Sequence, residues 1–165
     1  VLMRLVDVLL SIPGILLSLS IIIVTGFGSL QAAFAVGMTS VATFARLARS
    51  QVIQVAGADF VEAAYGSGAT QAQVLLRHVL PNSLTPVLAL AALQFGTAIL
   101  QLSILGFLGY GAPPPTPEWG LLIAEGRDFM ATAWWLILLP GLAIVATVMS
   151  ANHLSQVVQQ EDDVK

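Results

Sequence analysis

The chain of 165 residues has no cysteine and few charged residues. Without cysteine it can form neither a disulfide nor a thiolate metal site, and it has no cysteine nucleophile. Charged residues make up only 9% of the chain, against about a quarter in soluble proteins, so they cannot cover a water-soluble surface. The six basic residues are scattered and the formal net charge is −3, which argues against a nucleic-acid partner.

Apolar residues make up 57% of the chain and occur in long runs. A helix needs about 20 such residues to cross about 30 Å of hydrocarbon. The runs therefore predict an all-α, polytopic membrane protein with one transmembrane domain over residues 1–165. We place its spans at residues 9–26, 30–48, 86–108 and 134–152. A tight turn at 26–29 makes the first two a helical hairpin.

The arginines are unevenly distributed between the connections. Four fall on the side shared by the N-terminus and the segment 50–84: Arg4, Arg46, Arg49 and Arg77. Because basic residues accumulate in cytoplasmic loops, we expect this segment and both ends of the chain to be cytoplasmic. The connection 109–133 is then external, and its tryptophans suit the lipid headgroup region: Trp119, Trp134 and Trp135.

The predicted external connection is rich in proline and carries charges. Four prolines within residues 113–117 stiffen the chain and predict a folded flap. Its charged residues are either solvated or in contact with another protein: Glu118, Glu125, Arg127 and Asp128. The acidic residues of the C-terminal tail are interpreted as a solvated terminus: Glu161, Asp162 and Asp163.

The predicted cytoplasmic segment contains the sequence signals of two short helices. These are two capping pairs, a glycine that can end the first helix and a proline that can end the second: Asp59 with Glu62, Thr70 with Gln73, Gly68, and Pro81. Small residues at Ala63 and Ala64 permit close approach by another protein. The spacing alone fits a docking element and a simple connection equally well.

A longer motif distinguishes these two interpretations. The segment reads E-A-A, three residues, G, eleven residues, L-P, through Glu62, Ala63, Ala64, Gly68, Leu80 and Pro81. This pattern resembles the signature loop of the permease subunits of ABC importers. Stretches at 3–14, 45–52, 75–88, 108–120 and 124–130 are similar to the dipeptide, oligopeptide and nickel branch of that family. The resemblance covers nearly the whole chain.

The resemblance implies a type I importer bundle whose E-A-A loop is a coupling helix in a cleft of a cytoplasmic ATPase. Glu62, Ala63, Ala64 and Gly68 would take that role, with Leu80 and Pro81 completing the motif. The implied partners are ATP-binding subunits, a second permease subunit and an external or periplasmic solute-binding protein, at the bacterial inner membrane. The implied solutes are dipeptides, longer peptides, peptide-like conjugates or chelated nickel. Family members also have one or two further spans before the region where this chain begins.

No catalytic centre or cofactor site is predicted within the chain itself. It has no G-x-x-x-x-G-K-[ST] phosphate loop, so ATP hydrolysis would belong to a partner. His78 and His153 are lone histidines, and we expect no metal site. An intramembrane enzyme would need paired carboxylates, a metal motif or an activated nucleophile, which the spans lack. The alternative of an ion-coupled secondary transporter would usually place an ionisable residue inside a span, and no predicted span has one near its centre.

The third and fourth predicted spans contain polar and small residues at regular spacings. Gln94, Thr97 and Gln101 share one helix face, where they line a solute path or form hydrogen bonds to neighbouring helices. Small residues recur every four positions and predict close helix packing: Ala92 and Gly96 in the third span, and Ala143, Thr147 and Ala151 in the fourth.

Overall fold

The computed structural model describes residues 2–163, and the side chains of residues 2–157. The described residues form helices and no strand, which confirms the all-α prediction. In chain order these are α1 (Leu2–Ser11), α2 (Gly14–Thr25), α3 (Ser29–Ala56), α4 (Asp59–Gly66), α5 (Gln71–Val74), the π-helical turn η1 (Leu75–Val79), α6 (Leu80–Phe107), α7 (Trp119–Gly126), the 3-10 turn η2 (Arg127–Phe129) and α8 (Trp135–Asp163). The side chains of the acidic tail lie outside the described residues.

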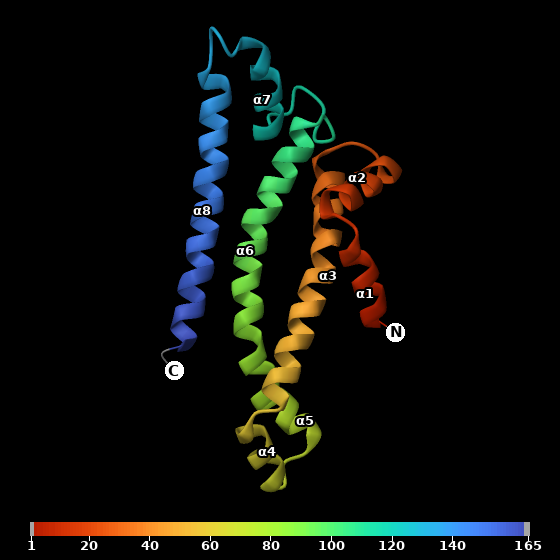
Figure 1. Ribbon diagram of the computed structural model, residues 1–165, viewed down its shortest axis with the longest axis vertical. Helices are drawn as coiled ribbons and strands as arrows, with labels where there is room; N and C mark the ends of the chain where they lie inside the picture. Colours follow the sequence, from red (N-terminus) through yellow and green to blue (C-terminus); the bar gives the residue numbers. More distant parts are fainter. Residues whose placement is uncertain (1, 164–165) are drawn as a thin grey trace.

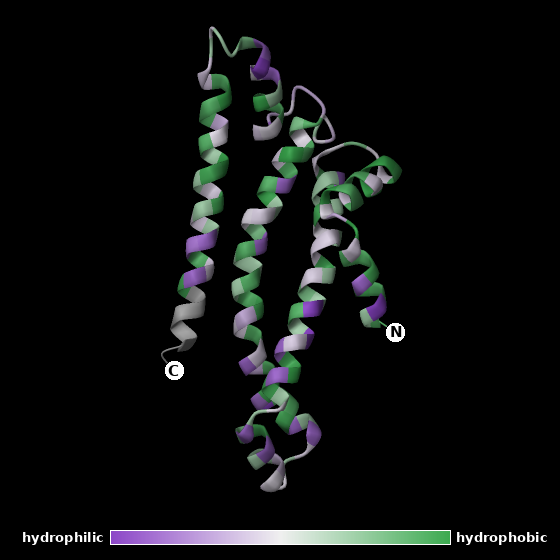
Figure 2. Cartoon of the chain, in the orientation of Figure 1, coloured by the Kyte–Doolittle hydropathy of each residue, from purple (hydrophilic) through white to green (hydrophobic). Residues whose placement is uncertain are grey.

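Three long helices, α3, α6 and α8, form the body of the molecule (Figure 1). The central helix α6 packs against both α3 and α8. Three helical runs are long and apolar enough to cross a membrane: Ser29–Ala56, Gln71–Phe107 and Trp135–Val157. Hydrophilic residues gather at the α4–α5 end, while the middle of the body is mostly hydrophobic (Figure 2). The architecture is that of a multi-pass helical membrane protein.

The first predicted span is not a single helix. We expected one helix over 9–26, but α1 ends at Ser11, α2 begins at Gly14, and the two helices meet at 97°. Pro13 explains the break, because it has no N–H and its ring disfavours a helical conformation at Ile12. Taken together, α1 and α2 are still apolar enough to form one broken span.

The turn between α2 and α3 depends on glycine. Gly26 and Gly28 have φ of 98° and 146°, values that side chains oppose. The turn folds α2 back onto α3, where Ile22 is buried against Ala32, Ala35, Val36 and Leu105. Through this apolar cluster, α2 and α3 both contact α6.

The contact between α6 and α8 is made by small residues, as the four-residue spacing predicts. A Cβ atom built on Gly96 would lie only 3.2 Å from the Cβ of Ala151, so the two helices approach closely there. One turn further along, the buried hydroxyl of Ser155 donates a hydrogen bond of 2.8 Å to the backbone oxygen of Ala89. Such contacts replace the hydrophobic force that is absent between helices in lipid.

The connection between α6 and α8 is a folded flap, as predicted. Its helix α7 packs against both α6 and α8 at the end of the molecule opposite α4 and α5 (Figure 1). Gly120 touches the backbone of α6 so closely that a Cβ atom there would overlap the oxygen of Ser103. Gly126 makes a similar contact with α8, where a Cβ atom would lie 3.0 Å from that of Leu136.

We predict that Gly120→Ala loosens the flap from α6. The added methyl group would meet rigid backbone, and such overpacking costs about 1–3 kcal/mol. The melting temperature of the purified protein in detergent should therefore fall. Gly141→Ala is the matched control, because a Cβ atom at that helical position has nothing within 4 Å. Equal melting temperatures for the two variants would contradict the close contact.

Candidate functional site

The segment between α3 and α6 forms a compact α4–α5 hairpin (residues 57–79) at one end of the molecule (Figure 1). Gly68 follows α4 with a φ of 87°, as expected for the glycine that ends the first helix. Thr70 and Gln73 form the predicted capping box, in which the Thr70 N–H donates to Gln73 Oε1 at 3.0 Å and the Gln73 N–H donates to Thr70 Oγ1. These two local predictions are confirmed.

Two other local predictions are wrong. Asp59 does not cap α4, because Ala58 occupies the N-cap position and makes no side-chain hydrogen bond; Asp59 lies in the first turn instead. The second helix does not end at Pro81 but runs on into α6. The π-helical turn η1 precedes this proline, and the Leu80 N–H bonds to the oxygen of Leu75. Pro81 therefore lies inside a continuous helical run, Gln71–Phe107, just after the π-helical turn that interrupts the regular hydrogen bonding there.

The α4–α5 hairpin has its own small core. Val61, Ala64, Val74 and Val79 are buried, with Val52, Val55 and Ala69 packed around them. Of the six motif residues, Ala64 is thus turned inward and holds α4 against α5 and the start of α6. The other five are exposed: Glu62, Ala63, Gly68, Leu80 and Pro81. The structure therefore divides the motif into a residue that supports the hairpin and residues available to a partner.

Two exposed aromatic residues accompany the motif and were missed by the sequence reasoning. Phe60 and Tyr65 lie on α4, and each is 48% exposed. The ring of Phe60 lies 6.5 Å from that of His78. Exposed aromatic side chains beside small residues are typical of protein interfaces, and this composition was the available signal.

A polar cleft of about 440 Å³ lies where the break between α1 and α2 faces α3 and α6. It brings together the three predicted residues of α6 with a polar face of α3, at the α1–α2 break. Its lining is Leu9, Leu10, Ser11, Ile12, Pro13, Gly14, Leu17, Thr39, Ser40, Thr43, Gln94, Thr97 and Gln101. None of these side chains is ionisable.

Hydrogen bonding within the polar cleft leaves its carboxamides free. The hydroxyls of Thr39 and Thr97 donate to backbone oxygens of their own helices, at 2.7 and 3.1 Å. Among the side chains that the structure describes, no hydrogen bond joins Gln94 or Gln101 to a neighbouring helix. Both alternatives for these residues, a solute path and hydrogen bonds to neighbouring helices, stay predictions.

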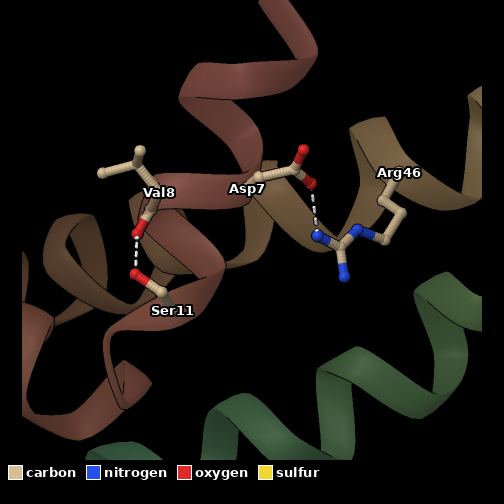
Figure 3. A network of polar contacts seen from close by, with 4 residues as sticks. All are labelled: Asp7, Val8, Ser11 and Arg46. Carbon is tan, nitrogen blue, oxygen red and sulfur yellow. Dashed lines mark hydrogen bonds and ion pairs between the residues drawn. The ribbon is translucent and has the colours of Figure 1, made fainter.

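An ion pair connects α1 and α3 beside the polar cleft (Figure 3). Arg46 of α3 donates to the Asp7 carboxylate of α1 at 2.6 Å, and both side chains are more than half exposed. Its energetic value at such exposure is small. Its structural meaning is that the charged part of α1 lies beside Arg46. Ser11, at the end of α1, donates to the oxygen of Val8 at 2.7 Å.

Glu118 has an internal role that the sequence reasoning missed. Its Oε1 accepts a bond of 2.8 Å from the Ser29 hydroxyl and one of 3.0 Å from the Ala112 N–H. The carboxylate thereby ties the flap to the first turn of α3, where the helix dipole favours negative charge. Gly106 and Gly111 leave it room, since a Cβ atom on either would crowd Oε2. Simple solvation therefore does not describe this carboxylate, and its contact with a partner stays a prediction.

Among the described residues, no three His, Asp or Glu side chains are grouped closely enough to hold a metal ion. The polar features that the structure does show are a hydrogen-bonding cleft between helices and an exposed hairpin at one end.

These features define a class: a multi-pass helical membrane protein with a polar cleft between its helices and an exposed, structured loop between two of its long helices. Residues 1–160 match the family described as binding-protein-dependent transport system inner membrane component. The chain belongs to this family.

Curated relatives agree with this assignment. The chain is 39% identical over 150 residues to the di/tripeptide transport system permease protein DppC of Pseudomonas aeruginosa. The matched region covers 91% of the chain and 50% of the relative. It is 38% identical to the dipeptide transport system permease protein DppC of Escherichia coli, over 92% of the chain and 51% of the relative. It is 40% identical to the glutathione transport system permease protein GsiD of Escherichia coli, over 92% and 50%. The chain spans about half the length of these relatives.

We predict that Glu118→Ala frees the flap from α3. The variant loses two hydrogen bonds to a charged acceptor, and a loss of about 1–3 kcal/mol in stability is expected. Proteolysis within residues 109–118 of the purified protein in detergent should become faster. Glu125→Ala is the control, because Glu125 is an exposed carboxylate of α7 that makes no hydrogen bond among the described residues. Identical cleavage rates in both variants would show that the contact does not hold the flap.

Proposed function

We propose that this chain is part of a permease subunit of an ATP-driven importer for di- or oligopeptides or closely related solutes. The observation that carries the proposal is the combination, on one helical frame, of an uncharged polar cleft with an exposed E-A-A hairpin. The names of the relatives support peptides and glutathione as the solute class. The family's description supports a solute-binding protein as a partner.

The polar cleft is the part of the chain that we assign to the solute path. Gln94, Thr97 and Gln101 line it from α6, and its volume is within the range of small-molecule sites. An ion-coupled secondary transporter usually has an ionisable side chain in such a position. The absence of one from the residues that line this cleft favours the importer.

The α4–α5 hairpin is the part that we assign to the ATPase. Glu62 and Ala63 are exposed on the same helix as Phe60 and Tyr65, which together offer a surface of small, acidic and aromatic side chains. The hairpin core joins this surface to the end of α3 and the start of α6. A movement of the hairpin would therefore be passed directly to two long helices.

We further propose that the hairpin is cytoplasmic and that the flap is external. The two lie at opposite ends of the molecule (Figure 1). Arg46, Arg49 and Arg77 lie toward the hairpin, in agreement with the charge rule for cytoplasmic loops.

The motif offers a matched pair of variants that tests the coupling role. We predict that Ala63→Arg lowers peptide-stimulated ATP hydrolysis by the assembled complex at least about tenfold, because a bulky charge on the exposed face obstructs docking. The melting temperature of the permease should not change. Ala64→Arg, only one residue away, should instead lower the melting temperature, because it places a charge in the hairpin core.

The measurement uses the full-length permease with its partner subunits, in proteoliposomes that contain a labelled dipeptide on the side of the binding protein. ATP-dependent uptake by the unchanged complex supports the importer. Uptake driven by an ion gradient without ATP would favour the secondary transporter. Unchanged peptide-stimulated ATP hydrolysis in the Ala63→Arg complex would contradict the docking role of the hairpin.

The proposed orientation is tested with single cysteines, since the chain has none of its own. A membrane-impermeant thiol reagent should label Ser67→Cys, in the exposed hairpin, only after the cytoplasmic face is opened. Thr116→Cys, in the exposed part of the flap, should be labelled from outside in intact cells. The reverse pattern would invert the topology.

A further inference from the structure

A second cavity adjoins the polar cleft between α1, α3 and α6. It has a volume of about 390 Å³ and shares Leu10 and Thr43 with the cleft. Its lining is Leu10, Thr43, Arg46, Leu47, Ser50 and Leu90. The two cavities together form a groove that continues along α3 toward the hairpin. Arg46 is the one charged residue among those that line either cavity.

Arg46 already holds a carboxylate in this structure. Its Nη2 donates to Asp7 Oδ1 at 2.6 Å, and the guanidinium makes no other hydrogen bond to the side chains that the structure describes. The two side chains point toward each other, while the second terminal nitrogen of Arg46 points away from Asp7 (Figure 3). A guanidinium pairs best with a carboxylate through two parallel N–H donors. The groove therefore contains a carboxylate site whose donors are only partly used.

The internal partner of Arg46 is held only weakly. The side chains of Arg46 and Asp7 are 55% and 60% exposed. At such exposure an ion pair is favoured over its separated state by only about 1.4- to 5-fold. Another carboxylate in the groove can therefore replace Asp7. Because an arginine keeps its charge at physiological pH, this position is suited to hold an anion and not to carry a proton.

We propose that Arg46 binds the carboxylate of a transported solute, such as the C-terminal carboxylate of a peptide, in exchange for the carboxylate of Asp7. The inference rests on the proposed function and names the residue that recognises a charged group of the solute. The rest of the groove lining is uncharged, so Arg46 is the point at which the groove attracts an anion. The exchange removes one tie between α1 and α3, so solute binding also changes the contact between these helices.

The test measures the Kd of two labelled solutes for the full-length permease, assembled with its own partner permease and ATPases in lipid nanodiscs. The solutes are trialanine and trialanine amide, which lacks the carboxylate. The solute-binding protein is left out, so its own preference does not enter the Kd. The permeases are the unchanged one, Asp7→Ala, Arg46→Gln and the double variant. Arg49→Gln is the matched control, because Arg49 is exposed on the same helix and lines neither cavity.

The two single variants should change the Kd of trialanine in opposite directions. Arg46→Gln should raise it by about fivefold or more, because charge-assisted hydrogen bonds to the carboxylate are lost. Asp7→Ala should lower it by about two- to sixfold, because the competing internal carboxylate is removed. The double variant should match Arg46→Gln, since Asp7 acts only through Arg46.

The controls should show no change. Arg49→Gln should keep the Kd of the unchanged permease, and none of the variants should change the Kd of trialanine amide. The melting temperatures of all the variants should be equal, because an exposed ion pair contributes little to stability.

Other results would overturn the inference. A higher Kd of trialanine in both single variants would show that the ion pair only supports the shape of the groove. A gain from Asp7→Ala that persists in the double variant would show general repulsion by Asp7 and not competition at Arg46. Equal effects on trialanine and its amide, or no binding of trialanine by the unchanged complex, would show that no carboxylate is recognised.

A separate measurement distinguishes failure of this inference from failure of the proposed function. ATP-dependent uptake of trialanine by the unchanged complex is measured in proteoliposomes with the solute-binding protein present. Uptake without the expected changes in Kd would refute the role of Arg46 alone. The absence of ATP-dependent uptake of any peptide would refute the proposed function, and this inference with it.

Discussion

The rest of the structure depends on one constraint: in hydrocarbon, every backbone N–H and C=O must find a partner within the protein. Continuous helices satisfy it, and α3, α6 and α8 account for most of the chain. Irregular backbone at membrane depth is tolerated only where it is buried in protein or faces a watery cavity. The break between Ser11 and Gly14 lines the polar cleft, and its residues Ser11, Ile12 and Pro13 are exposed. The constraint that keeps the long helices continuous therefore makes the interruption between α1 and α2 a marker of a polar environment.

The side chains of the cleft show how the free-energy cost of polar groups between helices is kept small. Thr39, Ser40 and Thr97 donate to carbonyls of the preceding turn, so their hydroxyls are partly satisfied before any ligand arrives. A carboxamide cannot do this as readily in a helix, and Gln94 and Gln101 have no such bond among the described residues. Burying an unpaired amide costs several kcal/mol, on the order of 2–7. Gln94 and Gln101 are only half-buried, so water or a solute in the cleft can supply the partners that their carboxamides lack.

Much of this arrangement could be predicted from the sequence, because periodicity, capping and turn residues act locally. The helical runs, the glycine after α4, the Thr70–Gln73 box and the Gly96–Ala151 contact all depend on residues within a turn or a face. The failures arose where one local rule competed with another. Pro13 was read as part of an apolar run, although it breaks the helix. Pro81 was read as a helix end, although the helical run continues past it after a π-helical turn. The partners of Glu118 lie 89 and 6 residues away, and no local pattern indicates the more distant one.

The central helix links all three functional features. The run from Gln71 to Phe107 is 37 residues long, about 55 Å, and it begins in the hairpin core with Val74 and Val79. It then carries Gln94 and Gln101 past the cleft and ends beneath the flap at Gly106. The run is not regular throughout, because the π-helical turn η1 and the prolines Pro81 and Pro86 lie between the hairpin and the cleft residues. Its least regular part is the π-helical turn η1, directly beside the hairpin core, and such turns are frequent at functional sites. The part of the run that can bend most easily thus lies between the surface that we assign to the ATPase and the residues of the cleft, so a movement of the hairpin would reach the cleft through this part.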